Sequence, residues 1–338
     1  MDCLTVSEKA GQGTIVLGTR GSALALVQAG MVEEALRRAW PGLEIERRII
    51  RTTGDQRTDV PLSEVAQVAQ VDKGIFIKEL ELALEAGEID VAVHSLKDVP
   101  SVLEEGFAIA AVLPRAAVRD VLVTTEEGGL GGLRKGATVA TSSVRRRRLL
   151  ESLRPDLRVV DIRGNVPTRI RKLHESGEID GLLLAQAGLA RLGLLGDGLV
   201  ESEGKEAYAE ELDEKIFVPA GGQGAVALET RAGDDGALAT CEAVNDAESM
   251  LTVRAERSFL TLLGAGCDTP VGVNGTMIRQ DDQGGETGDL LLRAVVFEDD
   301  EPEPLVGEVS GAGEDSEGLA ARLLAGLVRG NEPGRKNQ

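Results

Sequence analysis

The stretch Ile89-Asp90-Val91-Ala92-Val93-His94-Ser95-Leu96-Lys97-Asp98-Val99-Pro100 is a short apolar run that passes directly into a polar loop. Its first six residues predict a buried β-strand, and its last six predict the loop that leaves the carboxyl end of that strand. A strand this apolar is typical of a sheet that helices cover on both faces. The stretch therefore predicts an α/β fold, in which loops at the carboxyl ends of strands bind ligands.

Helices and strands alternate on the amino-terminal side of this stretch. Residues 14–18 and 43–51 have the apolar content of strands. Ser22 is placed to cap a helix that ends at Pro41-Gly42, and residues 73–86 have the apolar spacing of a second helix. Such alternation predicts a largely parallel sheet.

The same alternation recurs in the middle of the chain. Further strands are expected at 121–124, 137–141, 157–162 and 179–184, and helices after Ser142-Ser143, at 166–175 and from residue 188. The tetrapeptide Gly-Glu-Ile-Asp occurs at 87–90 and again at 177–180, each time between a helix and a strand. This repeat favours two α/β domains of similar build.

The texture of the sequence changes from about Asp234. A helix is expected at 248–263, strands at 290–297 and 304–309, and a last helix at 319–328. The stretches around 280–288 and 311–318 are acidic and Gly-rich, which is typical of surface loops. This part predicts a small third α+β domain with a disordered tail from residue 331.

The chain is strongly acidic, with 57 acidic and 37 basic residues and a formal net charge of −20. Dispersed carboxylates, few lysines and an aromatic content of 2% predict a halophilic acidic surface, which high internal salt would screen. The alternative is a generic acidic surface. The same acidity argues against a nucleic-acid partner.

Cysteine content and hydrophobic runs point to the compartment. Cys3, Cys241 and Cys267 are too few and too far apart for a disulfide framework or a zinc site. No apolar run approaches transmembrane length, and residues 1–13 contain no apolar export segment. We therefore expect a cytoplasmic protein with no metal and no membrane partner.

Cationic side chains cluster between residues 145 and 172, against the sign of the whole chain. The cluster comprises Arg145, Arg146, Arg147, Arg148, Arg154, Arg158, Arg163, Arg169, Arg171 and Lys172, against the carboxylates Glu151, Asp156 and Asp161. Guanidinium groups grip carboxylates or phosphates through paired hydrogen bonds, so the cluster predicts an anion site. A solvated helix face that merely balances local charge is the alternative.

Four polar segments fall at predicted carboxyl ends of strands, namely 19–22, 95–98, 141–146 and 163–165. Ligands bind at such ends, and a helix N-terminus there adds to the affinity for anions. The cations of these segments suit a polycarboxylate or a phosphate ester. A nucleotide is disfavoured because no Gly-rich loop ending in Lys-Ser/Thr occurs.

Two residues could carry chemistry. Asp98 is an acid among cations, and it either forms a structural salt bridge or stabilises a cation that develops on a substrate. Cys267 lies between Gly266 and Asp268, where it is either an inert thiol or a covalent attachment point. Neither His94 nor His174 is evident as its base, which disfavours a cysteine-protease-like dyad.

In their order along the chain, these segments resemble the porphobilinogen deaminase (hydroxymethylbilane synthase) family. The matching motifs lie at 18–25, 73–81, 93–100, 141–146, 163–166, 187–193, 219–225 and 264–267. The resemblance spans residues 14–273, and its specificity comes from all of these motifs being in register. It implies two periplasmic-binding-protein-like (type II) α/β domains flanking a cleft, plus a small C-terminal α+β domain. Domain 1 would comprise 14–113 with 215–240, domain 2 114–214, and domain 3 241–338.

The resemblance implies a monomeric transferase of tetrapyrrole biosynthesis (haem, sirohaem, cobalamin). Such an enzyme joins four porphobilinogen molecules with loss of ammonia and releases hydroxymethylbilane by hydrolysis. A dipyrromethane cofactor, bound to Cys267 through a thioether, would prime the growing oligopyrrole chain. Asp98 would be the catalytic carboxylate, stabilising the pyrrole cations that form as ammonia leaves.

The resemblance also assigns the cations and hydroxyls. Cofactor-binding positions would be Lys97, Thr141, Ser143, Arg145 and Arg146. Substrate-binding positions would be Arg20, Ser22, Arg163, Arg169 and Arg191, with Gln223 as a lesser contributor. Ordinary surface charge is expected of Arg147, Arg148, Arg154 and Arg158.

Residues 65–72 depart from the family pattern. The family usually has a Gly-Gly pair before the Lys-Gly that matches Lys73-Gly74, and this chain has a longer segment without it. In the family this loop covers the cleft, so the role of Lys73 and the behaviour of the lid stay open.

Two other classes of function are possible. A non-catalytic cleft-type binding protein for a small polycarboxylate would explain the arginines, but it would leave Cys267 and the third domain without a role. An intracellular ligand-sensing regulator would need a DNA-binding helix pair, which the sequence does not offer.

Overall fold

The computed structural model describes residues 10–11, 13–52, 77–266, 268–279, 288–298 and 301–329. The predictions for residues 65–76, Cys267, the 280–287 loop and the tail from 331 lie outside them. The chain forms two compact units, Met1–Ala116 with Gly224–Met250 and Ala117–Gln223 with Leu251–Gln338. The division into three domains at the expected boundaries stays a prediction.

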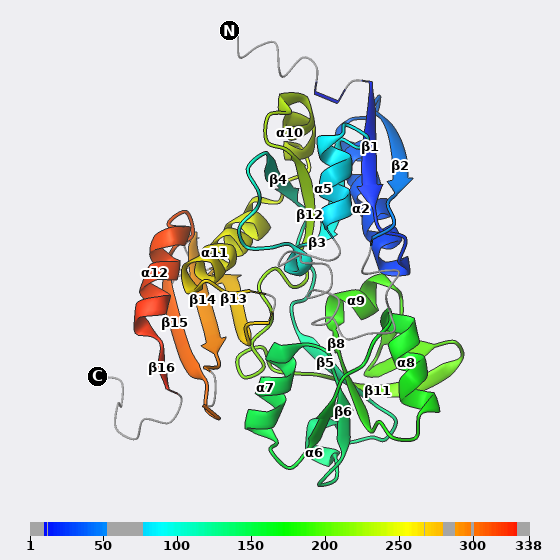
Figure 1. The fold of residues 1–338 in the computed structure, drawn as a ribbon, viewed down its shortest axis with the longest axis vertical. Coiled ribbons are helices and arrows are strands. Elements are labelled where there is room, and N and C mark those ends of the chain that lie inside the picture. The colour runs from blue at the N-terminus through cyan, green and yellow to red at the C-terminus, as the bar shows by residue number, and fades with distance from the viewer. Residues whose placement is uncertain are drawn as a thin grey trace. The chain divides into compact units, whose positions relative to one another are not determined.

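The first unit is built on a five-stranded sheet (Figure 1). Its strands lie in the order β2 (Glu44–Ile49), β1 (Thr14–Thr19), β3 (Val91–Ser95), β12 (Val226–Arg231) and β4 (Phe107–Val112). β1 is parallel to β2 and β3, whereas β12 is antiparallel to β3 and β4. The sheet is therefore largely parallel, as predicted, except that β12 runs against the other four strands.

The helices of this unit follow from their caps and apolar faces. Ser22 caps α2 (Ala23–Ala39), as predicted, because its Oγ accepts a hydrogen bond from Ala25 N at 3.3 Å. The other helices among the described residues of this unit include α5 (Lys78–Glu85) and α10 (Asp235–Glu242). Leu36 of α2 and Leu17 of β1 are fully buried in one core cluster, so α2 is held against the sheet by apolar packing.

The second unit contains a seven-stranded sheet. Its order is β7 (Arg158–Val160), β6 (Thr138–Ala140), β8 (Gly181–Ala185), β5 (Asp120–Thr124), β11 (Lys205–Glu211), β10 (Leu199–Ser202) and β9 (Leu195–Gly196). β6 is parallel to β7 and β8, and β5 is antiparallel to β8 and β11. The first five strands thus repeat the directions of the first sheet, with β5 in the place of β12. Its helices are α6 (Gly129–Gly132), α7 (Val144–Leu153), α8 (Val166–Glu175) and α9 (Gln186–Arg191).

The repeated tetrapeptide occupies the same place in both sheets. Asp90 precedes β3, and its Oδ2 accepts a hydrogen bond from Val16 N of β1 at 2.9 Å. Asp180 precedes β8, and its Oδ2 accepts from Thr138 N of β6 at 2.7 Å. Each aspartate therefore fixes the start of one strand to its parallel neighbour.

A separate antiparallel sheet follows in the second unit. It consists of β13 (Val271–Met277), β14 (Asp289–Val296), β15 (Leu305–Ala312) and β16 (Val328–Arg329). α11 (Ala247–Leu263) and α12 (Ser316–Gly326) supply apolar residues to its core, where Phe259 and Leu319 are fully buried. The predicted fold class, two α/β domains with a small α+β domain, is confirmed.

Candidate functional site

Lys97 and Asp98 lie where β3 ends. They belong to a 3-10 turn, Leu96–Asp98, whose first residue is buried and whose backbone N–H donates to Ala225 O at 3.1 Å. Lys97 and Asp98 are exposed. Among the ion pairs formed by described residues none includes Asp98, so the salt-bridge role weighed for it finds no partner there. The turn presents an exposed carboxylate at the end of a buried strand.

His94 is a core residue of the same strand. Its Nε2 lies 2.8 Å from Oε2 of Glu229 on β12, and both side chains are buried. This pair joins two neighbouring strands beneath the Lys97–Asp98 turn. His94 is therefore a structural residue, with Glu229 as its partner in the sheet.

Arg20 and Ser22 follow β1. The backbone before them is anchored by Thr19, which is fully buried and whose hydroxyl donates to Ala25 O at 3.2 Å. The hydroxyl oxygen of Ser22 serves the cap of α2, which leaves its proton available for a ligand.

The start of α7 collects four of the predicted cofactor-binding residues. Ser143 caps the helix, accepting from Arg146 N at 3.4 Å, and Thr141 Oγ1 accepts from Ser143 N at 3.2 Å. Thr141 is buried, as are Arg145 and Arg146, which are 4% and 6% exposed. Two adjacent buried arginines need an acceptor close by.

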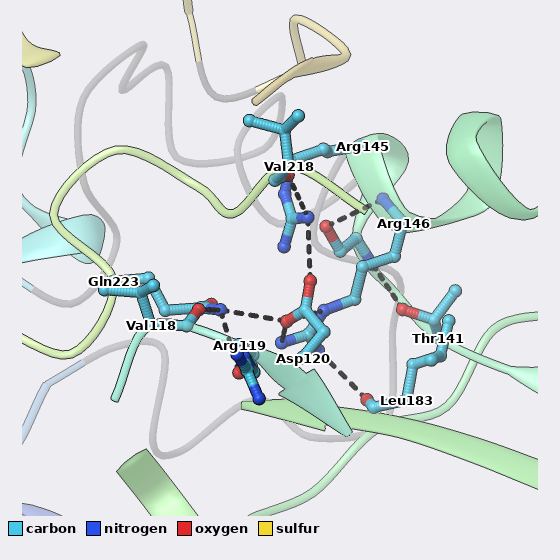
Figure 2. A network of polar contacts seen from close by, with 10 residues as sticks. Val118, Arg119, Asp120, Thr141, Arg145, Arg146, Leu183, Val218 and Gln223 are labelled. Carbon is cyan, nitrogen blue, oxygen red and sulfur yellow. Dashed lines mark hydrogen bonds and ion pairs between the residues drawn. The ribbon is translucent and has the colours of Figure 1, made fainter. Parts of the chain in front are cut away.

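That acceptor is Asp120, the first residue of β5, which is fully buried (Figure 2). Its Oδ2 lies 2.8 Å from Arg145 Nη1, and its Oδ1 lies 2.7 Å from Arg146 Nη2 and 3.0 Å from Arg146 Nε. Gln223 Nε2 donates to the same Oδ1 at 2.9 Å. Arg145 and Arg146 also donate to the carbonyl oxygens of Val218 and Leu183, at 2.8 and 2.9 Å.

The network keeps Asp120 charged. Burial alone would raise the pKa of its carboxyl, but the Arg145 and Arg146 guanidinium groups hold that pKa well below its usual range. Burial lowers the pKa of Arg145, and Asp120 opposes that change. Two guanidinium groups against one carboxylate leave a net positive charge in a buried place. Nε of Arg145 is buried there and has no hydrogen-bond acceptor among the described residues.

The remaining arginines of α7 and its neighbourhood have other partners. Arg147 Nη2 lies 2.7 Å from Asp161 Oδ1, with the two side chains 30% and 68% exposed. Arg148 lies 5.2 Å from the centre of the Phe297 ring and donates to Glu298 O at 3.2 Å, so it fastens α7 to the end of β14. Arg154 pairs with Asp156 at 2.8 Å. For these residues the reading as structural charge fits better than an anion site.

Gly164 shapes the backbone between Arg163 and Arg169. Gly164 has φ +115°, and a Cβ there would lie 2.7 Å from Thr168, so only glycine fits the bend before α8. Its carbonyl accepts from Arg169 Nε at 2.7 Å. Burial lowers the pKa of Arg163 and also that of Arg191, which ends α9.

Cys241 can be set aside as a reactive thiol. It is fully buried in the core of the first unit, and burial raises its pKa to about 12. A thiol with so high a pKa is a poor nucleophile. Cys267 lies outside the described residues, but the residues around it form a turn in which Gly266 N donates to Thr269 Oγ1 at 2.9 Å.

Asp120 and Glu256 are two buried carboxylates that the sequence patterns do not assign to a site. Glu256 of α11 is fully buried and accepts from Gly222 N and Gly275 N, each at 2.7 Å. It therefore joins the segment before β12 to β13. The sequence feature that could have identified Asp120 is a carboxylate at the start of an apolar strand. For Glu256 it is an acidic residue within the apolar pattern of a helix.

Two negative findings apply to the described part of the chain. No helix there is both long and apolar enough for a membrane span. No group of three or more His, Cys, Asp or Glu side chains there is arranged to hold a metal ion.

The family models and the curated relatives that match this chain name the same family. Residues 15–239 match the family described as porphobilinogen deaminase, dipyromethane cofactor binding domain, and residues 250–328 match porphobilinogen deaminase, C-terminal domain. A porphobilinogen deaminase of Rubrobacter xylanophilus is 44% identical over 95% of this chain and 99% of its own length. One of Roseiflexus sp. is 42% identical over 93% of this chain and 96% of its own. The periplasmic VFT2 domain of Bordetella pertussis BvgS, a solved structure, is 17% identical over 68% of this chain and 86% of its own, with a TM-score of 0.40.

Proposed function

Because the chain belongs to the porphobilinogen deaminase family, we propose that it is a transferase that makes hydroxymethylbilane. It would join four porphobilinogen molecules head to tail, releasing ammonia each time, and then free the product by hydrolysis. The observation that carries this proposal is the buried, net positive pair Arg145 and Arg146 with its single carboxylate, Asp120. Such a pair suits a ligand that brings its own carboxylates.

The residues present fit a dipyrromethane, the cofactor of the matched domain. The buried Nε of Arg145 needs one more acceptor, and a carboxylate arm of the cofactor would supply it. We propose that Lys97, Thr141, Ser143, Arg145 and Arg146 hold the cofactor and that Cys267 is its attachment point. When bound, the dipyrromethane supplies the pyrrole carbon to which the first porphobilinogen is joined.

Asp98 would act by electrostatic stabilisation of the substrate. Its exposed carboxylate at the end of β3 would stabilise the positive charge that develops on porphobilinogen as ammonia leaves. Arg20, Ser22, Arg163, Arg169 and Arg191 would bind the acetate and propionate arms of the substrate, with Gln223 in a lesser role. The alternative is a polycarboxylate-binding protein without catalytic activity. It explains the arginines but assigns no role to Asp98.

The wider setting is part of the same proposal. The chain would fold as three domains, 14–113 with 215–240, 114–214 and 241–338, and the first two would flank a cleft. It would work in the cytoplasm as a monomer, without nucleic acid, membrane or metal. Its pathway would be tetrapyrrole biosynthesis.

Intact mass tests the function and the attachment point together. Protein purified from a host supplied with porphobilinogen should carry the added mass of two pyrroles, and a Cys267→Ala variant should carry none. Cys241→Ala is the matched control. The Cys241 thiol is buried, so the variant that lacks it should still carry the added mass. Unmodified mass for the unaltered protein, together with no hydroxymethylbilane formed from porphobilinogen, would defeat the proposal.

The acidic surface leads to a prediction about salt. If the net charge of −20 is an adaptation to high internal salt, the melting temperature should rise steadily from dilute buffer to molar KCl, since salt screens the repulsion between carboxylates. Thermal unfolding followed by circular dichroism measures this. An unchanged melting temperature would rule out the halophilic interpretation in favour of a generic acidic surface.

A further inference from the structure

Three side chains from two distant segments converge on Asp120. Arg145 and Arg146 come from the first turn of α7, and Gln223 comes from the segment before β12 (Figure 2). Successive residues of a helix point about 100° apart, so Arg145 and Arg146 do not face the same way by default. Asp120 brings both guanidinium groups to one point, assigning Oδ2 to Arg145 and Oδ1 to Arg146.

Both guanidinium groups are held from two sides. Arg145 is fixed between Asp120 and the carbonyl of Val218, and Arg146 between Asp120 and the carbonyl of Leu183. A guanidinium has five N–H donors in one plane, so two such anchors set the direction of the donors that are left. Nε of Arg145 is one of these, buried and without an acceptor in the described structure.

The same carboxylate is connected to two of the three places where the chain passes between its two units. These places lie after residues 116 and 223. Gln223 Nε2 donates to Val118 O at 2.6 Å as well as to Asp120 Oδ1 at 2.9 Å. Asp120 therefore fixes the arginine pair relative to both ends of the segment 117–223.

We propose that Asp120 is a positioning residue, whose buried carboxylate orients Arg145 and Arg146 to receive the carboxylates of the pyrrole chain. This inference rests on the proposed function, because it concerns how the cofactor-binding arginines are prepared. Asp120 itself would touch neither cofactor nor substrate. Its loss should therefore weaken binding and leave the chemical step nearly unchanged.

The test is an Asp120→Glu variant, which keeps the charge and moves the carboxylate by one methylene. We expect it to fold, to carry the two-pyrrole mass on a minor fraction of chains, and to show a KM for porphobilinogen raised about 10- to 100-fold. The kcat per loaded chain should change little. Asp161→Glu is the matched control, since Asp161 pairs with Arg147 of the same helix at the surface and should change neither loading nor KM.

The outcomes separate this inference from the proposed function. Wild-type protein that lacks the added mass and makes no product refutes the function. Wild-type activity together with normal loading and KM in Asp120→Glu overturns the positioning role, as does a fall in kcat at unchanged KM. If circular dichroism shows that Asp120→Glu is unfolded, Asp120→Asn decides, because it keeps the size of the side chain and an oxygen acceptor for Arg146 and removes the charge. A KM raised about fivefold supports the inference, and an unchanged KM overturns it.

Discussion

Replacing Asp98 by asparagine should lower kcat about 10²- to 10³-fold and leave the KM for porphobilinogen nearly unchanged. Asparagine has the shape of aspartate without its charge. Since positive charge reaches the pyrrole ring only as ammonia leaves, a negative charge at this point acts mainly on the transition state. An exposed side chain with no ion pair to a described residue contributes little to the fold, so the variant should melt like the parent.

Single-turnover ammonia release on protein already loaded with cofactor is the appropriate measurement, because it isolates the chemical step. Glu105→Gln is a matched control, as it removes an exposed carboxylate from the loop that follows. Near-normal turnover in Asp98→Asn would remove Asp98 from the mechanism. A higher KM at unchanged kcat would reassign it to substrate binding.

Local features of this chain could be predicted from sequence, and long-range ones could not. Ser22 and Ser143 were predicted as helix caps because a cap depends on residues within one turn. The antiparallel course of β12 was missed, since the place of a strand in a sheet depends on partners far away in the chain. Asp120 lies 26 positions from Arg146, and no pattern within either segment links the two.

The arginine cluster shows the same limit. Its charge was evident from composition, but the alternatives of an anion site and a balanced surface stayed open. The structure divides the cluster by depth: Arg145 and Arg146 are buried against Asp120, while Arg147 pairs with Asp161 in solvent. The family resemblance separates these adjacent arginines in the same way, and their packing gives the physical reason.

That difference in depth predicts a large difference in stability. Asp120→Ala should lower the free energy of unfolding by about 3–5 kcal/mol, because it leaves two buried guanidinium groups without their carboxylate. Asp161→Ala removes the partner of Arg147, which is part-exposed, and should cost at most about 1 kcal/mol. Urea unfolding followed by circular dichroism measures both. Hydrogen exchange in peptides from β5 and α7 should locate the loss in the second unit.

The pH dependence of this difference identifies its cause. The pKa of Asp120 is lowered in the folded chain, so its contribution is fully present above the pKa of an unfolded aspartate, about 3.9, and is lost as the pH falls through the folded value. The gap between the parent and Asp120→Ala should therefore be constant from neutral pH down to about pH 5, and it should narrow only below about pH 4. A cavity effect would instead be the same at every pH. A gap that stays constant down to acid unfolding would assign the loss to packing, and the charge of Asp120 would then not be what holds the arginine pair.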